Sequence, residues 1–112
     1  MSEIKVVRKK DAKSFIEGDE HCRLYVNTGK IVFGTSDLLA GKRGEVDPGH
    51  KKGDEIFYVV RGRVICHFPN RGLCEQLEEG DIVVVPPDEP HQLINVGEDK
   101  TIVCWGLAPP DK

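Results

Sequence analysis

The chain has 112 residues and a formal net charge of −3, and its length is that of a single domain with one hydrophobic core. The acidic balance excludes the strongly basic surface typical of nucleic-acid-binding domains, and no window approaches the roughly 18 apolar residues that a membrane-spanning helix needs. We therefore expect one domain, residues 1–112, with neither nucleic acid nor a membrane as partner.

The N-terminus and the cysteines bear on the cellular compartment. Residues 1–5 contain no apolar signal core, so we expect a cytoplasmic protein. The cysteines include no closely spaced pair of the kind that marks a zinc site, and in a reducing compartment we expect free thiols. They are Cys22, Cys66, Cys74 and Cys104.

Short runs of β-branched and aromatic residues, separated by many of the 12 glycines and 7 prolines, indicate strands joined by turns. We expect an N-terminal arm over residues 1–22, in which 10–16 could form a helical turn, and a core barrel over about 23–107. The expected strands are 23–27, 30–34, 55–60, 63–68, 81–85, 91–95 and 101–107. This spacing predicts an all-β antiparallel sandwich or barrel.

Residues 55–68 are predicted to form a β-hairpin with its turn at Arg61-Gly62. Side chains alternate between the two faces of a strand. One predicted face consists of Glu55, Phe57, Val59, Val64, Cys66 and Phe68. The other consists of Ile56, Tyr58, Val60, Ile65 and His67. Both faces are largely apolar, so we expect the second to be covered as well, by another sheet or by a second copy of the chain in a homodimer.

A second unit follows residue 80, where an apolar strand stops at Pro86-Pro87, which cannot sustain central ladder pairing. After a turn, a new strand begins at His91, and His91, Leu93 and Asn95 alternate onto one face. The last expected strand places two neighbouring side chains on opposite faces, and the sequence leaves open which one points inward: Cys104 or Trp105.

His50, four residues, Glu55, six residues and Gly62 follow one another with a spacing that resembles the first motif of the cupin superfamily. That motif usually opens with two histidines separated by one residue. Here Pro48 stands where the first histidine belongs.

The second cupin motif is similar to Gly80, five residues, Pro86, then His91, three residues and Asn95. The usual glycine is replaced by Asp88. The resemblance extends over about residues 40–107, which is well over half of the chain. The resemblance implies an antiparallel cupin-type β-barrel, a double-stranded β-helix or jelly-roll.

His50 and Glu55 are five residues apart, so an unbroken strand would place them on opposite faces. Residues 51–54 must therefore break the strand, and Gly53 suits such a break. The resemblance implies that His50, Glu55 and His91 are metal ligands, three where similar cupins carry four. Two imidazoles and a carboxylate suit divalent Fe, Mn, Zn, Ni or Cu and leave positions for substrate or dioxygen. The alternative is a metal-free cupin in which these groups form a hydrogen-bonded polar cluster.

Four further residues are candidates for substrate binding. Lys42 and Arg43 precede the site, where they could clamp a carboxylate at the barrel mouth or lie in solvent. Phe57 and Cys66 share the inward face, although Cys66 could equally pack as a small buried hydrophobe. Glu55 is the candidate catalytic residue, for proton transfer beside a metal that polarises a carbonyl or hydroxyl.

Cupins include isomerases, lyases, epimerases, decarboxylases and dioxygenases besides binding and storage proteins, so the fold does not determine the chemistry. The leading hypothesis is a metal-dependent isomerase, lyase or dioxygenase acting on an anionic small molecule, such as an oxo acid, a sugar acid or a sugar derivative. The alternatives are a non-catalytic binding or sensor module, possible without a metal, and an assembly partner with a vestigial pocket.

Overall fold

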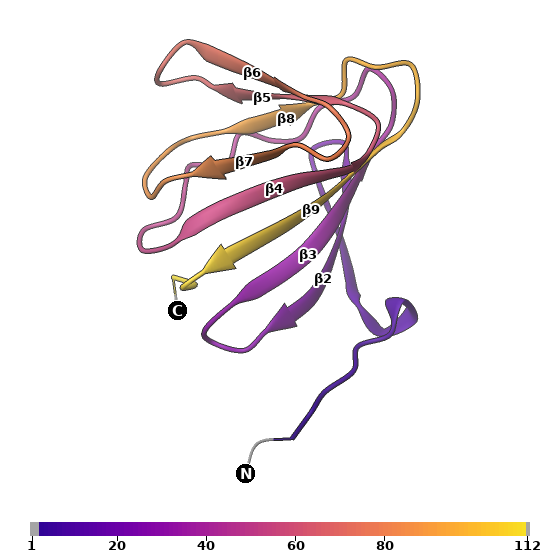
Figure 1. Ribbon diagram of the computed structural model, residues 1–112, viewed down its shortest axis with the longest axis vertical. Helices are drawn as coiled ribbons and strands as arrows, with labels where there is room; N and C mark the ends of the chain where they lie inside the picture. Colours follow the sequence, from indigo (N-terminus) through magenta and orange to yellow (C-terminus); the bar gives the residue numbers. More distant parts are fainter. Residues whose placement is uncertain (1–2, 112) are drawn as a thin grey trace.

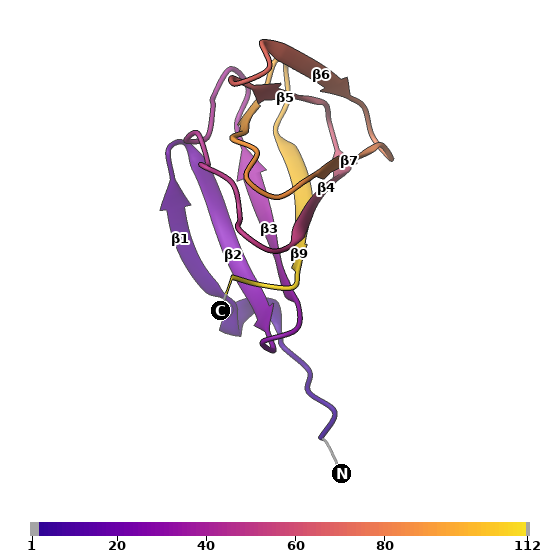
Figure 2. The same ribbon diagram turned by 90° about the vertical axis from the view of Figure 1, so that its left-hand side faces the viewer.

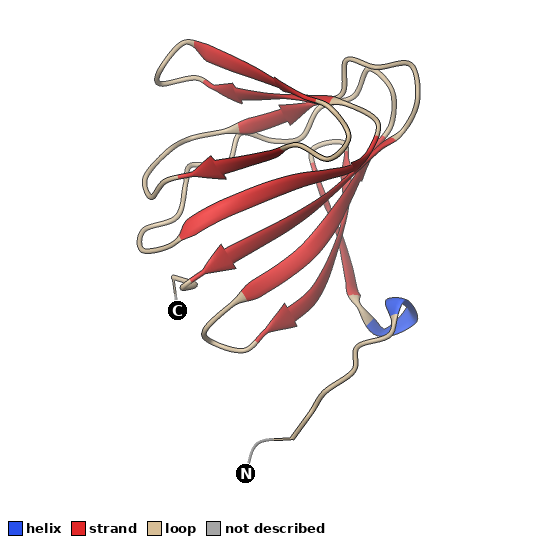
Figure 3. Cartoon of the chain, in the orientation of Figure 1, coloured by secondary structure: helices blue, strands red, loops and turns tan. Residues whose placement is uncertain are grey.

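The computed structural model describes residues 3–111, which form nine β-strands and one short helix (Figures 1 and 3). The helix, η1, is a 3₁₀ turn over Lys9–Asp11. The strands are β1 (Lys13–Glu17), β2 (Glu20–Asn27), β3 (Val32–Leu38), β4 (Asp54–Arg61), β5 (Val64–Phe68), β6 (Leu73–Leu77), β7 (Ile82–Val85), β8 (Gln92–Ile94) and β9 (Thr101–Ala108). The predicted all-β class is confirmed. Within residues 3–111, no helix combines the length and apolar character needed to span a bilayer.

The strands form two antiparallel sheets that enclose the interior (Figure 2). The larger has the order β1-β2-β3-β9-β4-β7, and the smaller has the order β6-β5-β8. The long connection from β3 to β4 also contributes, because Arg43 bridges to Ile94 and Asp47 bridges to His91. Segments distant in sequence therefore meet across the barrel.

The buried core lies between the two sheets, because each strand turns alternate side chains inward. Strands β4 and β5 both show this alternation in their burial. The core cluster consists of Leu38, Phe57, Val59, Val64, Cys66, Phe68, Leu77, Val85, Leu93 and Val103. The predicted buried face of residues 55–68 is thus largely the core itself.

The predicted hairpin between β4 and β5 is wrong, although the choice of buried side chains was right. Strand β4 pairs with β7 and β9, whereas β5 pairs with β6 and β8. Gly62 and Arg63 therefore carry the chain from one sheet to the other. Gly62 has a φ of 82°, and a Cβ there would lie 2.7 Å from Oγ1 of Thr101. Alternation predicts which face is buried, but it does not identify the neighbouring strand.

The larger sheet also begins earlier than expected. Strand β1 and the start of β2 lie inside the range 1–22 that was expected as an arm. Only Lys9–Asp11 is helical, and most of the expected helical turn over 10–16 is strand. Strand β6 was missed because most of its side chains are exposed and its residues lack an apolar run.

The four cysteines are free thiols, as expected. Cys22 and Cys66 are buried and Cys74 is exposed. Burial raises the pKa of the Cys66 thiol to about 12 and that of the Cys22 thiol to about 11. These two buried thiols therefore stay protonated. Cys66 packs in the apolar core, whereas the Cys22 sulfur lies 3.4 Å from the Ser36 hydroxyl.

Candidate metal centre and ligand cavity

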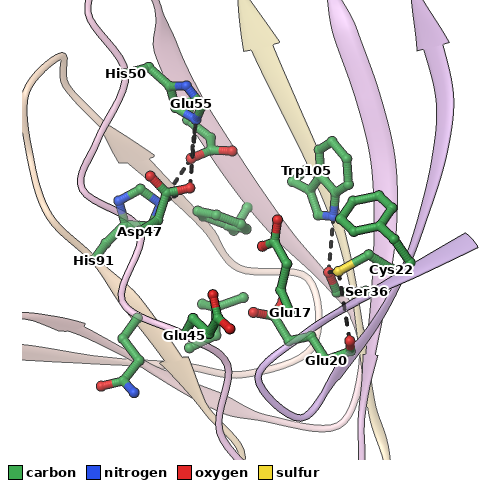
Figure 4. A pocket seen from close by; sticks show the side chains of 14 residues that line it. Glu17, Glu20, Cys22, Ser36, Glu45, Asp47, His50, Glu55, His91 and Trp105 are labelled. Atoms are coloured by element: carbon green, nitrogen blue, oxygen red, sulfur yellow. Dashed lines mark hydrogen bonds and ion pairs between the residues drawn. The ribbon is translucent and has the colours of Figure 1, made fainter.

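A cavity of about 130 Å³ lies inside the barrel beside the start of β4 (Figure 4). Its walls come from β1, β2, β3, β4 and β9, together with residues in the ranges 45–50 and 91–93. Polar and aromatic side chains from both ends of the sequence therefore face one small space.

Four side chains converge on one side of this cavity, and we call them the ligand cluster: Asp47, His50, Glu55 and His91. Nε2 of His50 lies 3.4 Å from Oε1 of Glu55 and 3.8 Å from Oδ2 of Asp47. Nε2 of His91 lies 2.9 Å from the same Glu55 oxygen and 3.9 Å from the same Asp47 oxygen. The structure thus brings together the three predicted ligand residues and adds Asp47, which the sequence analysis did not single out.

Backbone pairing fixes the segments that carry the cluster. The amide of Asp47 donates to the carbonyl of His91 at 2.8 Å, and the amide of His91 donates back at 3.0 Å. The amide of Asp88 donates to the carbonyl of His50 at 2.7 Å. Asp88 stands where the motif has a glycine and adopts a φ of 61°, a conformation that Asp tolerates better than most residues.

The chain bends between His50 and Glu55, as predicted. Residues 51–53 form the bend and β4 starts at Asp54. A Cβ at Gly53 would overlap the carbonyl oxygen of Pro109, so the absence of a side chain lets the C-terminal segment pass directly beside the bend. The bend allows both His50 and Glu55 to face the cavity.

His91 presents an unpaired nitrogen to the cavity. Its Nδ1 lies 2.8 Å from the Glu89 carbonyl oxygen, which can only accept, so Nδ1 carries the hydrogen. Nε2 is then a lone-pair acceptor that faces Oε1 of Glu55, and both atoms are buried without a hydrogen-bond partner. Burial lowers the pKa of His91, but Glu55, the Glu89 carbonyl and Asp47 outweigh it and raise the pKa overall. A proton or a metal ion between these two atoms would remove the repulsion.

His50 is oriented from outside the cavity by the C-terminal segment. Its Nδ1 lies 3.3 Å from Oδ2 of Asp111, and the amide of Lys51 donates to Oδ1 of the same carboxylate at 2.7 Å. The Lys51 amide and the His50 ring lower the pKa of Asp111. With Nδ1 directed at Asp111, Nε2 of His50 is turned toward Glu55 and Asp47.

Asp47, His50 and Glu55 lie close enough together to hold a divalent transition metal ion, and Nε2 of His91 faces the same Glu55 oxygen. For bonds of about 2.1 Å, two ligand atoms on one ion lie about 3.0 to 3.4 Å apart, close to the shorter separations in the cluster. Oδ1 of Asp47 accepts from the Gly49 amide at 2.8 Å, which leaves Oδ2 for the cavity. Histidine metal ligands are typically held through their other ring nitrogen by a carboxylate or a backbone carbonyl. Both histidines of the cluster are held in this way.

Three more carboxylates line the cavity outside the ligand cluster, and we call them the acidic wall: Glu17, Glu20 and Glu45. Burial raises the pKa of Glu20 to about 7, against the opposing effect of the Ser36 hydroxyl. A Cβ at Gly44 would overlap the Glu20 carboxylate, so glycine at this position makes room for it. Burial and the nearby carboxylates also raise the pKa of Glu17.

Aromatic side chains complete the cavity. One of them shows which of Cys104 and Trp105 points inward. Trp105 lines the cavity together with Phe15 and Phe57, so Trp105 points inward and Cys104 does not. The indole Nε1 donates to the Ser36 hydroxyl at 3.0 Å. In Figure 4, Trp105 and Glu17 lie across the cavity from His91.

The four predicted substrate-binding residues divide into one that lines the cavity and three that do not. Phe57 lines it. Cys66 is fully buried in the apolar core, which is the second of its two predicted roles. Lys42 and Arg43 are exposed and do not line the cavity, so the predicted cationic clamp is absent. The backbone explains this, because Arg43 pairs with Ile94 on the smaller sheet.

The cupin domain family matches residues 34–106 of the chain. The germin-like protein subfamily 3 member 2 of Arabidopsis thaliana is 32% identical over 87 residues, which are 73% of this chain and 37% of that protein. The chain spans less than half the length of the curated relatives it matches.

Solved structures are similar over almost the whole chain. A predicted oxalate decarboxylase from Thermotoga maritima has a TM-score of 0.78 at 17% identity, covering 93% of this chain and 98% of that one. A conserved protein with a double-stranded β-helix domain from Klebsiella pneumoniae has a TM-score of 0.80 at 21% identity, covering 97% and 93%. At these identities the likeness shows the fold alone.

Proposed function

This chain belongs to the cupin domain family, and from that membership and the ligand cluster we propose that it is a metal-dependent enzyme acting on a small molecule. The observation that carries the proposal is the pair of buried, unpartnered atoms, Oε1 of Glu55 and Nε2 of His91. Two such acceptors at 2.9 Å repel each other unless a positive group lies between them.

Asp47, His50, Glu55 and His91 would hold the ion, with His50 oriented by Asp111 and His91 by the Glu89 carbonyl. A bound transition metal supplies Lewis acidity that polarises a carbonyl or hydroxyl oxygen. Glu55 is the buried carboxylate nearest His91, so it is the candidate for taking up or returning a substrate proton. These roles fit isomerase, lyase or dioxygenase chemistry.

The proposal of a metal-dependent enzyme does not include the charge of the ligand, which remains a prediction. An anionic ligand was expected because Lys42 and Arg43 precede the site, but neither lines the cavity. An anion such as an oxo acid would therefore depend on the metal for its attraction. The likeness to a predicted oxalate decarboxylase shows a shared fold and does not select that substrate.

The test is metal content and affinity. Protein expressed with supplemented Fe, Mn, Zn, Ni or Cu should hold about one ion per chain by elemental analysis. His50→Ala and His91→Ala should each lose it while keeping the β-rich circular dichroism spectrum. Less than about a tenth of an ion per chain, with no binding on titration, would overturn the proposal.

A metal-free binding or sensor cupin is the second candidate, and one observation favours it. The Glu55 carboxylate takes part in raising the pKa of His91, so a proton shared by the two groups can satisfy both. In that case His50→Ala and His91→Ala should leave ligand affinity unchanged. Removing metal from the wild-type protein with a chelator should not change it either. A vestigial pocket would bind neither metal nor ligand.

We also propose a homodimer formed through the outer face of β4 and β7. Ile56 lies opposite Val84, and Tyr58 lies opposite Ile82. All four side chains are exposed large hydrophobics, and the strands that carry them, β4 and β7, lie side by side (Figure 1). Sedimentation should show a dimer that Val84→Lys converts to a monomer. A wild-type monomer at micromolar concentration would contradict this.

A cytoplasmic location is consistent with the four free thiols, since a reducing compartment keeps cysteines unpaired. Cell fractionation with an antibody against the protein tests it directly.

A further inference from the structure

The cavity wall carries negative charge without a compensating basic side chain. Among the residues that line it are five carboxylates and neither a lysine nor an arginine. The ion pairs formed within residues 3–111 leave out all three members of the acidic wall. A divalent ion in the ligand cluster would balance Asp47 and Glu55 and leave the acidic wall uncompensated.

Several of the side-chain hydrogen-bond donors that line the cavity are already used within the protein. Nε1 of Trp105 donates to Ser36, and Nε2 of Gln92 donates to the Gly44 carbonyl at 2.9 Å. Nδ1 of His91 faces the Glu89 carbonyl. The groups left to meet a ligand are therefore mostly acceptors, and a ligand that fits them must bring its own donors.

The carboxylates of the acidic wall are not grouped closely enough to form a second metal site. Within the described part of the chain, the one group of three residues whose ligand atoms lie close enough for an ion is Asp47, His50 and Glu55. Glu20 is buried at 7% exposure, whereas Glu17 and Glu45 are exposed, so their charges are spread over the wall. Spread acceptors beside Trp105 and Phe15 suit an organic cation, which also gains from the aromatic faces.

The cavity also limits the size of the ligand. Its volume of about 130 Å³ is close to the roughly 150 Å³ of an engineered cavity that holds one benzene molecule. A ligand of about four to eight non-hydrogen atoms is therefore the expected scale.

We propose that this cavity takes a small ligand bearing an ammonium group, which lies against the acidic wall beside Trp105 while the ligand's oxygen end faces the ligand cluster. The inference concerns the same cavity as the proposed function and rests on that cavity being the ligand site. It names the class as amino alcohols and similar small amines, in place of the anion expected from the sequence.

A charge series of matched size tests this on metal-free protein. The probes are protonated ethanolamine, ethylene glycol and glycolate, titrated at about pH 8, where Glu20 with its pKa of about 7 is ionised. Trp105 is the one tryptophan in the sequence and lines the cavity, so its fluorescence reports occupancy, with calorimetry as a second readout. Ethanolamine should bind about tenfold tighter than ethylene glycol, and glycolate should bind most weakly.

Two variants make the test specific. Glu20→Gln should weaken ethanolamine binding by about tenfold and leave ethylene glycol binding unchanged. Glu75→Gln, on the exposed strand β6, is the matched control and should change neither. Equal losses for both probes in Glu20→Gln, glycolate binding at least as tight as ethanolamine, or no saturable ethanolamine binding would each overturn the inference.

Because the titrations use metal-free protein, their outcome does not depend on metal content. A chain that holds a metal but prefers glycolate without it retains the proposed function and loses this inference. A chain that holds no metal but prefers ethanolamine loses the enzyme proposal and retains the ammonium site.

Discussion

The ligand cluster and the acidic wall face the same cavity, but they are held in different ways. In the cluster, Nδ1 of each histidine is engaged, by Asp111 for His50 and by the Glu89 carbonyl for His91. The members of the acidic wall take part in none of the ion pairs that residues 3–111 form. One part of the cavity thus holds closely spaced donor atoms, and the other holds carboxylates that have no charged partner.

The difference follows from where each set lies in the fold. The cluster is carried by segments that pair with each other through backbone hydrogen bonds, notably Asp47 with His91. Two members of the acidic wall, Glu17 and Glu20, flank the turn between β1 and β2 at the edge of the larger sheet. Strand β1, which carries Glu17, is the edge strand of this sheet, and an edge strand adjusts more readily than a paired central strand.

The largest effect is expected from Glu55→Gln, which removes a charge from the ligand cluster. Metal affinity should fall more than about 100-fold, because the amide is a poor ligand and its NH₂ can donate to Nε2 of His91. For the same reason the metal-free variant should be more stable than wild type. Competition titration with a chromogenic chelator measures the affinity, and a loss below threefold would contradict the assignment.

The acidic wall should show itself in the pH dependence of stability. Burial raises the pKa of Glu20 from 4.5 to about 7, so the folded chain holds a proton that the unfolded chain has already released. The free energy of unfolding should therefore fall as the pH rises from about 4.5 to 7, by roughly 2 kcal/mol. Urea unfolding at pH 5 and pH 8 should show this loss in wild type.

Glu20→Gln is the matched variant for that measurement. It carries no titrating group at this position, so its stability should change less than that of wild type over the same interval, and it should exceed wild type at pH 8. An unfolding free energy that rises with pH equally in both proteins would show that Glu20 is not strained by burial.

Asp111→Asn should weaken metal binding by about tenfold without abolishing it. The substitution keeps the size of the side chain but removes the charge that orients His50 through Nδ1. The visible spectrum of the Co²⁺ form should shift, which a merely structural change elsewhere would not cause. Asp99→Asn, at an exposed position outside the cavity, should leave affinity and spectrum unchanged, and equal effects in both variants would reject a positioning role for Asp111.

The smallest effect separates the two sides of the cavity. Glu17→Gln should change metal affinity less than about threefold, because its carboxylate influences the ion only through space. The same chelator competition measures it. A loss as large as that of Glu55→Gln would make Glu17 a metal ligand and remove the distinction between ligand cluster and acidic wall.

Much of the fold could be predicted because alternation and motif spacing constrain it locally. The buried set running from Phe57 to Phe68 followed from parity alone, and His91, Leu93 and Asn95 are buried together as expected. The pairing of β4 with β9, rather than with β5, could not be predicted from this pattern. Strand neighbours depend on contacts across the whole sheet, which a single hairpin-like segment does not encode.

The convergence of three candidate ligands was expected from residue type and motif spacing. His50, Glu55 and His91 do converge, because the bend at 51–53 lets the first two face inward. Asp47 was overlooked although it directly precedes Pro48, which occupies the missing histidine position. Asp47 could have been identified because it is a carboxylate next to the position where the motif lacks its first histidine.

The acidic wall was hidden for a different reason. Glu17 and Glu20 belong to a charged stretch that has the composition of a solvated turn, and it was assigned to an arm outside the barrel. Only the pairing of β1 with β2 brings them to the cavity. The opposite error concerned Lys42 and Arg43, whose proximity in sequence to His50 did not bring them to the site.

The cysteines differ in burial, and this difference allows one of them to be labelled selectively. The thiolate is the form that reacts with alkylating reagents, and burial keeps Cys22 and Cys66 protonated at neutral pH. Cys74 is the exposed thiol among the four, on strand β6. A maleimide dye or spin label should therefore attach there first, so that binding can be followed on the native sequence without engineering an attachment point.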